Sequence, residues 1–337
     1  MKFTELGLSE DILSAIVKAG YETPTPIQEQ TIMLALDGKD VIGQAQTGTG
    51  KTAAFGLPTL NKIDVNGGLQ AIVIAPTREL AVQSQEELFR FGRDKGIKVR
   101  SVFGGASIDK QIKALKSGAH VVVGTPGRMV DLIKRRALQL GDIETLILDE
   151  ADEMLNMGFI DDLEFIIKAT PAERQTLLFS ATMPDAIKKI GVKFMKEPQH
   201  VKIVSKEMTS DLIDQYYVKT KEFEKFDVLT RLIDVQKPEL AIVFGRTKRR
   251  VDEITRGLKL LGYRAEGIHG DLAQQKRLAV LRDFKNDNLD VLVATDVAGR
   301  GIDVKNIEAV FNYDMPRDDE DYIHRIGRTG RAGNKGI

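Results

Sequence analysis

Two segments in the first half of the chain have the residue types that bind a nucleoside triphosphate. The first is "AQTGTGKT" (45–52), which lies between an apolar run and the helical pattern "TAAFGLPTL". A strand, a glycine-bearing loop and a Lys-Thr helix start form the P-loop arrangement, in which backbone N–H groups hold phosphates. We expect Lys51 to reach the β and γ phosphates and Thr52 to coordinate magnesium. The remaining expected phosphate-binding residues are Thr47, Gly48, Thr49 and Gly50.

This P-loop departs from the usual pattern at one position, because Ala45 stands where a glycine normally opens it. The alternative reading is an ordinary glycine-rich turn followed by a capping threonine. The flanking strand and helix patterns favour the P-loop.

The second segment is "TLILDEADEML" (145–155), in which three carboxylates follow a buried strand pattern. A magnesium nucleotide site needs a carboxylate at the end of a neighbouring strand, and Asp149 fits that requirement. Hydrolysis also needs a group that positions or deprotonates water, and Glu150 fits that role. The alternative is a helix N-cap, since helical "EMLNMGFIDDLEFIIKA" (153–169) comes next.

Composition limits the remaining choices. A chain of 337 residues is long enough for about two domains. The 49 basic and 49 acidic residues balance, so any nucleic-acid binding must be local. With no cysteine and four scattered histidines, neither disulfides nor a cysteine or histidine metal site is expected. The charged N-terminal segment resembles neither a signal peptide nor a membrane span, so we expect a soluble, cytoplasmic protein.

The elements that must position these residues follow one repeated order: an apolar β-branched run, a polar turn, then a helical pattern. This order predicts parallel α/β sheets. We expect domains at residues 1–205 and 206–337, with a linker near 204–211. Expected strands lie in "DVIGQA", "QAIVIAPT", "KVRSVFGG", "HVVVGTP", "TLILDE", "TLLFSAT", "HVKIV", "QYYVKT", "LAIVFGRT", "YRAEGIHG", "DVLVATD" and "AVFNYDMP". Polar clusters follow the strand ends, where parallel sheets bind ligands.

Taken together, the motifs resemble the DEAD-box RNA helicases, ATPases of helicase superfamily 2, from Phe3 to Arg331. The block "GYETPTPIQ" (20–28) is similar to the family's Q motif. The resemblance implies that Gln28 hydrogen-bonds adenine, that Tyr21 packs against it and that Phe3 assists. An amide suits this role because it offers one donor and one acceptor. Without the resemblance, Gln28 would be read as a residue at a helix start.

Further segments of the first half resemble the family's RNA-binding and coupling motifs. These are "PTRELA" (76–81), "GG" (104–105), "TPGR" (125–128) and "SAT" (180–182). Hydroxyls, arginines and exposed turns suit sugar-phosphate contacts better than base reading. The implied RNA-binding residues are Pro76, Thr77, Arg78, Gly105, Thr125 and Arg128. The implied coupling residues are Asp152, Ser180 and Thr182.

The second half supplies the motifs that an isolated P-loop domain lacks. In "HRIGRTGR" (324–331) three arginines recur at three-residue intervals and would share a face if the segment is helical. The resemblance makes Arg328 and Arg331 arginine fingers and makes His324 a coupling residue. It assigns Asp303 to the ribose. The implied RNA contacts of this half are Thr247, Gln274, Arg277 and Thr295.

The resemblance implies two doubly wound, RecA-like domains joined by a short linker, with ATP and RNA sites at the cleft between them. It implies an ATP-dependent RNA helicase that uses ATP and Mg²⁺ and couples hydrolysis to domain closure, RNA bending and local unwinding. Two alternatives stay open: an ATP-regulated RNA clamp or ribonucleoprotein-remodelling protein with little unwinding, and a P-loop metabolic kinase. The chain stops six residues past Arg331, so we expect an incomplete second domain.

Overall fold

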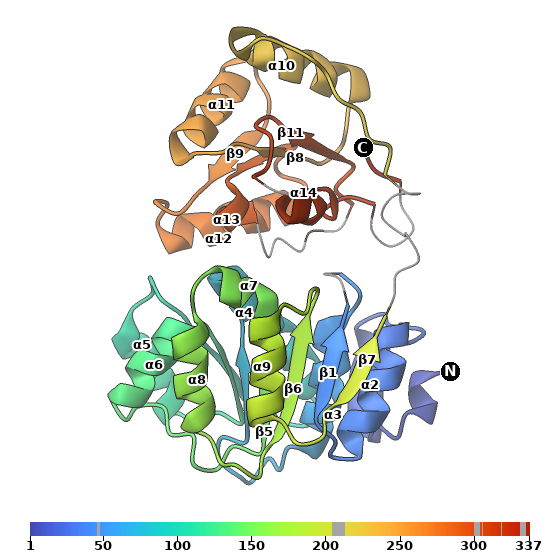
Figure 1. Ribbon diagram of the computed structural model, residues 1–337, viewed down its shortest axis with the longest axis vertical. Helices are drawn as coiled ribbons and strands as arrows, with labels where there is room; N and C mark the ends of the chain where they lie inside the picture. Colours follow the sequence, from blue (N-terminus) through green and yellow to red (C-terminus); the bar gives the residue numbers. More distant parts are fainter. Residues whose placement is uncertain (46–47, 204–212, 300–303, 305, 318, 331–334) are drawn as a thin grey trace. The chain divides into compact units, whose positions relative to one another are not determined.

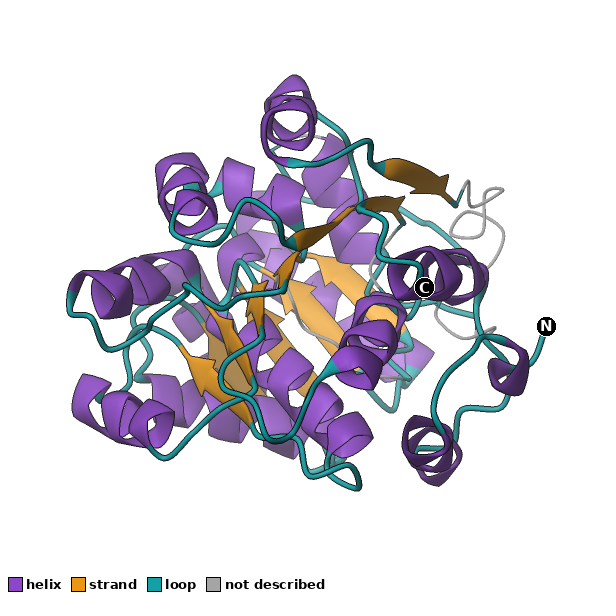
Figure 2. Ribbon diagram, turned by 90° about the horizontal axis from the view of Figure 1, so that it is seen from below, coloured by secondary structure: helices purple, strands orange, loops and turns teal. Residues whose placement is uncertain are grey.

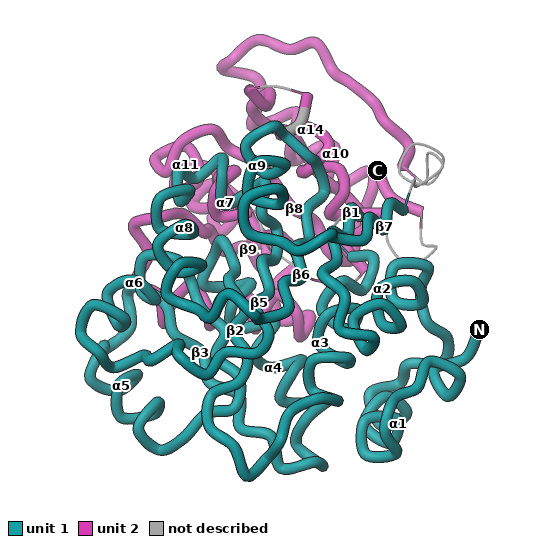
Figure 3. The backbone as a smooth tube through the Cα atoms, turned by 60° about the horizontal axis from the view of Figure 1, so that its bottom comes forward, with its two compact units in different colours: residues 1–204 teal, residues 205–337 magenta. Residues whose placement is uncertain are grey.

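The computed structural model describes residues 1–45, 48–203, 213–299, 304, 306–317, 319–330 and 335–337. The chain divides into two compact units, Met1–Val204 and Ser205–Ile337 (Figure 3). Each unit contains a parallel sheet, so the predicted α/β fold class is confirmed. Among the described residues, no helix is both long enough and apolar enough to cross a bilayer.

Unit 1 contains a seven-stranded sheet in the order β3-β4-β2-β5-β6-β1-β7, and its strand pairs are parallel (Figure 1). The strands are β1 (Val41–Gln44), β2 (Ala71–Ile74), β3 (Val99–Val102), β4 (Val121–Gly124), β5 (Thr145–Leu148), β6 (Gln175–Ser180) and β7 (Gln199–Lys202). Since all strands run the same way, the residues that follow them share one edge of the sheet.

Helices cover both faces of this sheet (Figure 2). Successive strand residues point to opposite faces, so Val73 packs in one buried cluster and Ile72 and Ile74 in the other. Burial on both faces explains why the strands are uninterrupted apolar runs. The helices are the 3₁₀ turn η1 (Phe3–Glu5), α1 (Glu10–Lys18), α2 (Pro26–Leu36), α3 (Lys51–Lys62), α4 (Arg78–Gly92), α5 (Ile108–Lys116), α6 (Pro126–Lys134), α7 (Ala151–Asn156), α8 (Ile160–Lys168) and α9 (Asp185–Phe194).

Unit 2 contains a four-stranded parallel sheet in the order β11-β8-β10-β9. Its strands are β8 (Ala241–Phe244), β9 (Ala265–Ile268), β10 (Val291–Ala294) and β11 (Ala309–Asn312). Its helices are the 3₁₀ turn η2 (Glu222–Glu224), α10 (Lys225–Gln236), α11 (Lys248–Leu260), α12 (Gln274–Lys285), α13 (Asp296–Gly299) and α14 (Asp319–Ile326). Two buried clusters flank the sheet, as in unit 1.

Two sequence-based expectations about elements are wrong, and the condition attached to a third, that 324–331 is helical, does not hold for its described residues. The segment 215–220 is not a strand: Tyr216 and Tyr217 are exposed, and of the nearby residues that the structure describes only Ile213 forms a bridge, with Gly336. The predicted helix over 153–169 is two helices, α7 and α8, because Gly158 has a φ of +79° between them. Helix α14 ends at Ile326, so Arg325 lies in the helix and Arg328 lies after its end, and these two arginines do not share a helical face. Arg331 lies outside the described residues.

Candidate functional site

The P-loop joins the end of β1 to α3. Gly50 precedes the helix with φ +87° and ψ +28°, a left-handed conformation that favours glycine. A Cβ at this position would lie 2.3 Å from the side-chain nitrogen of Gln28, so any other residue would have to displace that side chain. Gly48 has a φ of +84°, and Lys51 and Thr52 begin α3. Thr47 lies outside the described residues.

Lys51 faces the carboxylates that follow β5. Its Nζ lies 3.8 Å from Oε1 of Glu150, and both side chains are almost fully buried. Nζ of Lys51 and Oδ1 of Asp149 are buried and have no hydrogen-bond partner in the described part of the chain. Polar atoms buried without partners are costly, and a phosphate and a cation would satisfy these two.

Burial is the main cause that raises the pKa of Asp149, to about 7, and the neighbouring Glu150 and Asp152 carboxylates add to it. The Lys51 ammonium acts in the opposite direction. A bound cation would stabilise the carboxylate form, so the buried Asp149 oxygen fits the expected magnesium site. The described residues hold no group of three His, Cys, Asp or Glu side chains that could bind a metal alone. A magnesium ion completed by phosphates and water is consistent with a single carboxylate.

Glu150 has an unusual backbone conformation, with φ +50° and ψ +55°. It occupies the N-cap position of α7, but its side chain makes no capping hydrogen bond. Non-glycine residues in the left-handed region store strain and cluster at active sites. The Glu150 carboxylate lies 3.8 Å from Nζ of Lys51 and makes no capping bond, which disfavours the simple capping alternative.

Asp152 joins the segment after β5 to the segment after β6. Its Oδ2 accepts hydrogen bonds from the Thr182 N–H at 2.7 Å and from the Thr182 hydroxyl at 2.8 Å. The Asp152 N–H donates to Oγ of Ser180 at 3.1 Å. The expected coupling residues of unit 1 are therefore in direct contact.

The expected adenine-binding residues form two groups. Gln28 is 1% exposed; its Oε1 accepts the Thr25 N–H, and its Nε2 donates to the Gly50 carbonyl at 3.1 Å. This side chain is thus fixed against the P-loop. Tyr21 packs edge-on against Phe3 and Phe91, at ring-centroid distances of 6.4 and 5.6 Å.

A further residue, Glu87 on α4, fixes Tyr21 and was not found by sequence reasoning. The Tyr21 hydroxyl donates to its carboxylate at 2.8 Å. No sequence motif pointed to Glu87, because it lies 66 positions away in the chain.

Two arginines hold the loop that follows β3. The Arg78 guanidinium lies against Gly105, where a Cβ would be 2.4 Å from Nη1 and where φ is +78°. Arg128 donates to the Ala106 carbonyl at 3.2 Å from both terminal nitrogens, and Nη1 also donates to Gln111. Burial lowers the pKa of Arg128. Arg128, which the resemblance names as an RNA-binding residue, thus holds the loop after β3 through these hydrogen bonds.

The other expected RNA contacts of unit 1 lie at helix starts on the same sheet edge. Thr77 caps α4 by accepting the Leu80 N–H, and Pro76 is buried beside it. Thr125 is the N-cap residue of α6, without a side-chain capping bond. These positions follow β2 and β4, which are neighbours in the sheet.

In unit 2 the expected RNA contacts follow three adjacent strands, β8, β10 and β9. Thr247 caps α11 by accepting the Arg250 N–H at 3.1 Å. Thr295 follows β10, and Gln274 begins α12. Arg277 is nearly buried and donates to the Ala298 carbonyl at 3.1 Å, so it joins α12 to α13. The structure therefore brings these side chains to one edge.

The expected arginine-finger segment is organised by a residue without an assigned role, Arg325. Its guanidinium binds both oxygens of Asp296, at 2.5 and 3.0 Å, and lies over the Phe244 ring. Arg328 is buried, and its Nε donates to the His324 carbonyl at 3.2 Å. Asp303 and Arg331 lie outside the described residues. The regular arginine spacing includes Arg325 and was the sequence signal that could have pointed to it.

A parallel sheet with a P-loop after one strand and acidic residues after another defines a P-loop nucleotide-binding protein, here with a second RecA-like unit. Residues 25–190 match the family described as "DEAD/DEAH box helicase", and residues 224–333 match "Helicase conserved C-terminal domain". The chain belongs to the DEAD-box ATP-dependent RNA helicase family, which confirms the resemblance seen in the sequence.

Named relatives agree with this assignment. The chain is 74% identical over 329 residues to the DEAD-box ATP-dependent RNA helicase CshA of Streptococcus pneumoniae, covering 97% of this chain and 63% of the relative. It is 62% identical to the CshA of Limosilactobacillus reuteri, of which it covers 68%. The chain thus spans about two thirds of the length of these relatives.

Solved structures show the same fold. Saccharomyces cerevisiae Dbp5 bound to RNA and ADP BeF3 superposes with a TM-score of 0.90 at 37% identity, covering 100% of this chain and 88% of that one. A DEAD box protein from Methanococcus jannaschii is 45% identical, with a TM-score of 0.61, covering 100% and 91% of the two chains.

Proposed function

We propose that this chain is an ATP-dependent RNA helicase core whose ATP hydrolysis is stimulated by RNA. The observation that carries the proposal is the group formed by Lys51, Asp149 and Glu150. One ammonium nitrogen and one carboxylate oxygen are buried there without hydrogen-bond partners in the described residues, beside a phosphate-binding turn. Buried polar atoms without partners are costly, and a phosphate beside Lys51 and a cation beside Asp149 would remove that cost. Dbp5, a structural neighbour, is bound to RNA and ADP BeF3, which supports the same ligand classes here.

The side chains of unit 1 would hold ATP and activate water. Lys51 would bind the β and γ phosphates, while the Thr52 hydroxyl and Asp149 would hold Mg²⁺. When bound, Mg²⁺ supplies charge stabilisation for the phosphoryl oxygens. Glu150 would accept a proton from the attacking water or orient it, since its strained backbone directs the carboxylate to this group.

The side chains of unit 2 would complete the reaction and bind RNA. Arg328 and Arg331 would stabilise charge on the transferring phosphate, so hydrolysis would require both units. RNA would be bound through its sugar-phosphate backbone, by residues of both units, without base preference. Because ATP and RNA would favour the same closed state, each would tighten binding of the other. Closure that bends one strand would separate a short duplex.

An ATPase titration tests the proposal. The rate of phosphate release is measured with increasing single-stranded RNA, beside single-stranded DNA and no nucleic acid. We expect RNA to raise the rate and DNA to leave it low. A rate that is indifferent to RNA would remove the coupled mechanism. A parallel strand-displacement assay separates unwinding from an RNA clamp, which would retain RNA in the presence of ATP and displace no strand.

A further inference from the structure

Tyr21, the aromatic residue expected beside the adenine base, has a fixed backbone at the end of α1. Gly20 has a φ of +79°, and its N–H donates to the Val17 carbonyl at 3.0 Å. The Tyr21 N–H donates to the Ile16 carbonyl at 3.1 Å. These two bonds form the left-handed cap that often ends a helix. The end of α1 therefore sets where the Tyr21 side chain leaves the backbone, and other contacts must set its side-chain torsions.

The direction of the Tyr21 side chain is set mainly by α4. Its hydroxyl donates to Oε1 of Glu87 at 2.8 Å, and its ring lies edge-on against Phe91, with 5.6 Å between the ring centroids. Glu87 and Phe91 are four positions apart, so they lie on the same face of α4. Phe3 packs edge-on against the same ring at 6.4 Å. The tip and the edges of the Tyr21 ring are thus all in contact, which leaves one orientation for it.

Helices α1 and α4 pack against one another, so they should move together. Ile16 of α1 and Leu88 and Phe91 of α4 belong to one buried cluster of unit 1. Nζ of Lys18, the last residue of α1, lies 2.7 Å from Oδ2 of Asp94, two residues beyond the end of α4. This exposed ion pair contributes little to stability, but the close-packed core beneath it makes the two helices one rigid body.

The other end of α4 lies at a segment that the resemblance assigns to RNA. Thr77 caps the helix, and Arg78 is its first residue. The Arg78 guanidinium lies against Gly105, in the loop that follows β3. Glu87 is nine residues after Arg78, about 14 Å along the helix axis. One rigid helix therefore contacts both an expected RNA-binding loop and the ring expected to pack on adenine.

We propose that Glu87 is a positioning residue for the adenine base and that α4 links this base to the RNA-binding loop. Glu87 acts through Tyr21, by holding the ring in the orientation that packs on the base. A shift of α4 on RNA binding moves Glu87 and Phe91 with Arg78, and so changes how well Tyr21 fits adenine. This role rests on the proposed function, because it needs ATP at the P-loop and RNA at residues 76–78.

Binding of ADP and of inorganic pyrophosphate, each with Mg²⁺ and followed by calorimetry on the 337-residue chain, tests the positioning role. Pyrophosphate lacks the adenosine group, so it does not use Tyr21. We expect Glu87→Ala to weaken ADP binding about fivefold to tenfold, the effect of one lost charge-assisted hydrogen bond. Pyrophosphate binding should stay within about twofold. Equal losses for both ligands would indicate general damage to unit 1 and would overturn the positioning role.

Three further variants separate the Tyr21 contact from other effects. Glu86→Ala is the matched control, since it removes an exposed carboxylate next to Glu87 on the same helix, and both affinities should stay within about twofold. Tyr21→Phe removes only the hydroxyl and should weaken ADP binding as much as Glu87→Ala does. Combining these two changes should cause no larger loss than either alone, because both remove the same hydrogen bond. Losses that multiply would show that the two residues act independently. If Glu87→Ala fails to fold, Tyr21→Phe and Glu87→Gln decide the inference; glutamine keeps an oxygen acceptor and should retain most of the ADP affinity.

The link through α4 is tested by the effect of RNA on nucleotide affinity. Binding of ADP with beryllium fluoride is measured with and without a saturating oligouridylate, and the ratio of the two affinities is compared between variants. We expect RNA to tighten nucleotide binding in the unmodified chain and this ratio to fall about threefold or more in Glu87→Ala, but not in Glu86→Ala. An unchanged ratio in Glu87→Ala would remove α4 from the link.

The two hypotheses fail in different ways. If the unmodified chain binds no adenine nucleotide, or if RNA does not tighten that binding, the proposed function is wrong. If it shows both properties and Glu87→Ala binds ADP as well as the unmodified chain does, only the inference about Glu87 is wrong.

Discussion

The carboxylate of Asp152 accepts two hydrogen bonds from Thr182, one from the backbone N–H at 2.7 Å and one from the hydroxyl at 2.8 Å. Asp152 lies two residues after Glu150 on the same short segment, so its position and that of the expected water-activating carboxylate are linked. We propose that a change at the end of β6 reaches the nucleotide site through this contact.

Thr182→Val tests this link. The variant keeps the backbone bond but removes the hydroxyl donor to a charged acceptor, an interaction of about 1.5 to 3 kcal/mol. We expect the RNA-stimulated ATPase rate to fall about tenfold or more, with a smaller change in ATP affinity. Thr176→Val is the matched control, since the hydroxyl of Thr176, on the strand β6 that leads to Thr182, is buried and has no hydrogen-bond partner among the described residues. Equal losses in both variants would contradict a specific coupling role.

Glu150→Gln tests the assignment of the group that activates water. Glutamine has nearly the same size but cannot accept a proton, so we expect ATP binding to persist while turnover falls below detection. Binding of a fluorescent ATP analogue and single-turnover phosphate release measure the two properties separately. Near-normal turnover would remove Glu150 from this role.

Arg328→Ala tests the arginine-finger assignment. A finger contributes about a thousandfold or more to phosphoryl transfer, so the RNA-stimulated rate should fall by that order. Arg328→Lys keeps the charge and should recover only part of the rate, because ammonium lacks the planar fork of guanidinium. A loss of tenfold or less in the alanine variant would indicate a structural residue, as expected for Arg325 with its buried ion pair to Asp296.

Much of the fold follows from the sequence because buried parallel strands are continuous apolar runs that end in polar turns. The P-loop and the position of Asp149 could be predicted for the same reason, since both follow such runs. The segment 215–220 has the composition of a strand, but a strand also needs a paired neighbour, which composition does not reveal. Among the described residues from 213 to 220, only Ile213 is bridged.

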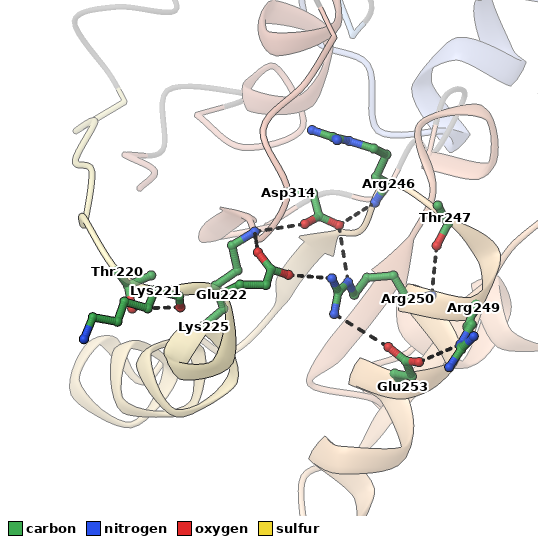
Figure 4. Close-up of polar contacts among 10 residues, drawn as sticks. All are labelled: Thr220, Lys221, Glu222, Lys225, Arg246, Thr247, Arg249, Arg250, Glu253 and Asp314. Carbon is green, nitrogen blue, oxygen red and sulfur yellow. Dashed lines mark hydrogen bonds and ion pairs between the residues drawn. The ribbon is translucent and has the colours of Figure 1, made fainter.

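The parts of the site that the sequence did not predict depend on tertiary contacts. The left-handed conformation of Glu150 is unfavourable locally and exists because the surrounding structure imposes it, so no local propensity predicts it. Asp314 follows a strand as Asp149 does, yet its carboxylate accepts the N–H of Arg246, 68 positions earlier in the chain (Figure 4). Contacts of this kind become visible only when β8 and β11 lie side by side.

The raised pKa of Asp149 predicts a dependence of stability on pH. Burial raises the pKa of Asp149 from 3.8 to about 7. Between about pH 4 and pH 7 the Asp149 carboxyl is therefore protonated in the folded protein, whereas in the unfolded chain it has lost its proton. The free energy of unfolding should therefore fall as pH rises from about 4 to about 7 and should level off above that. Denaturation without nucleotide or Mg²⁺, at pH 5 and pH 8, measures the effect.

Asp149→Asn should remove this pH-dependent loss of stability. At pH 8 the free energy of unfolding of the variant should exceed that of the unmodified chain, and at pH 5 the difference between the two should be smaller. Asp40→Asn is a useful contrast, since the buried Asp40 carboxylate accepts the backbone N–H groups of Thr176 and Lys196. An amide replaces one of these acceptors with a donor, so this variant should be less stable at both pH values. If both variants lose stability equally at both pH values, burial of the Asp149 carboxylate does not destabilise the folded protein.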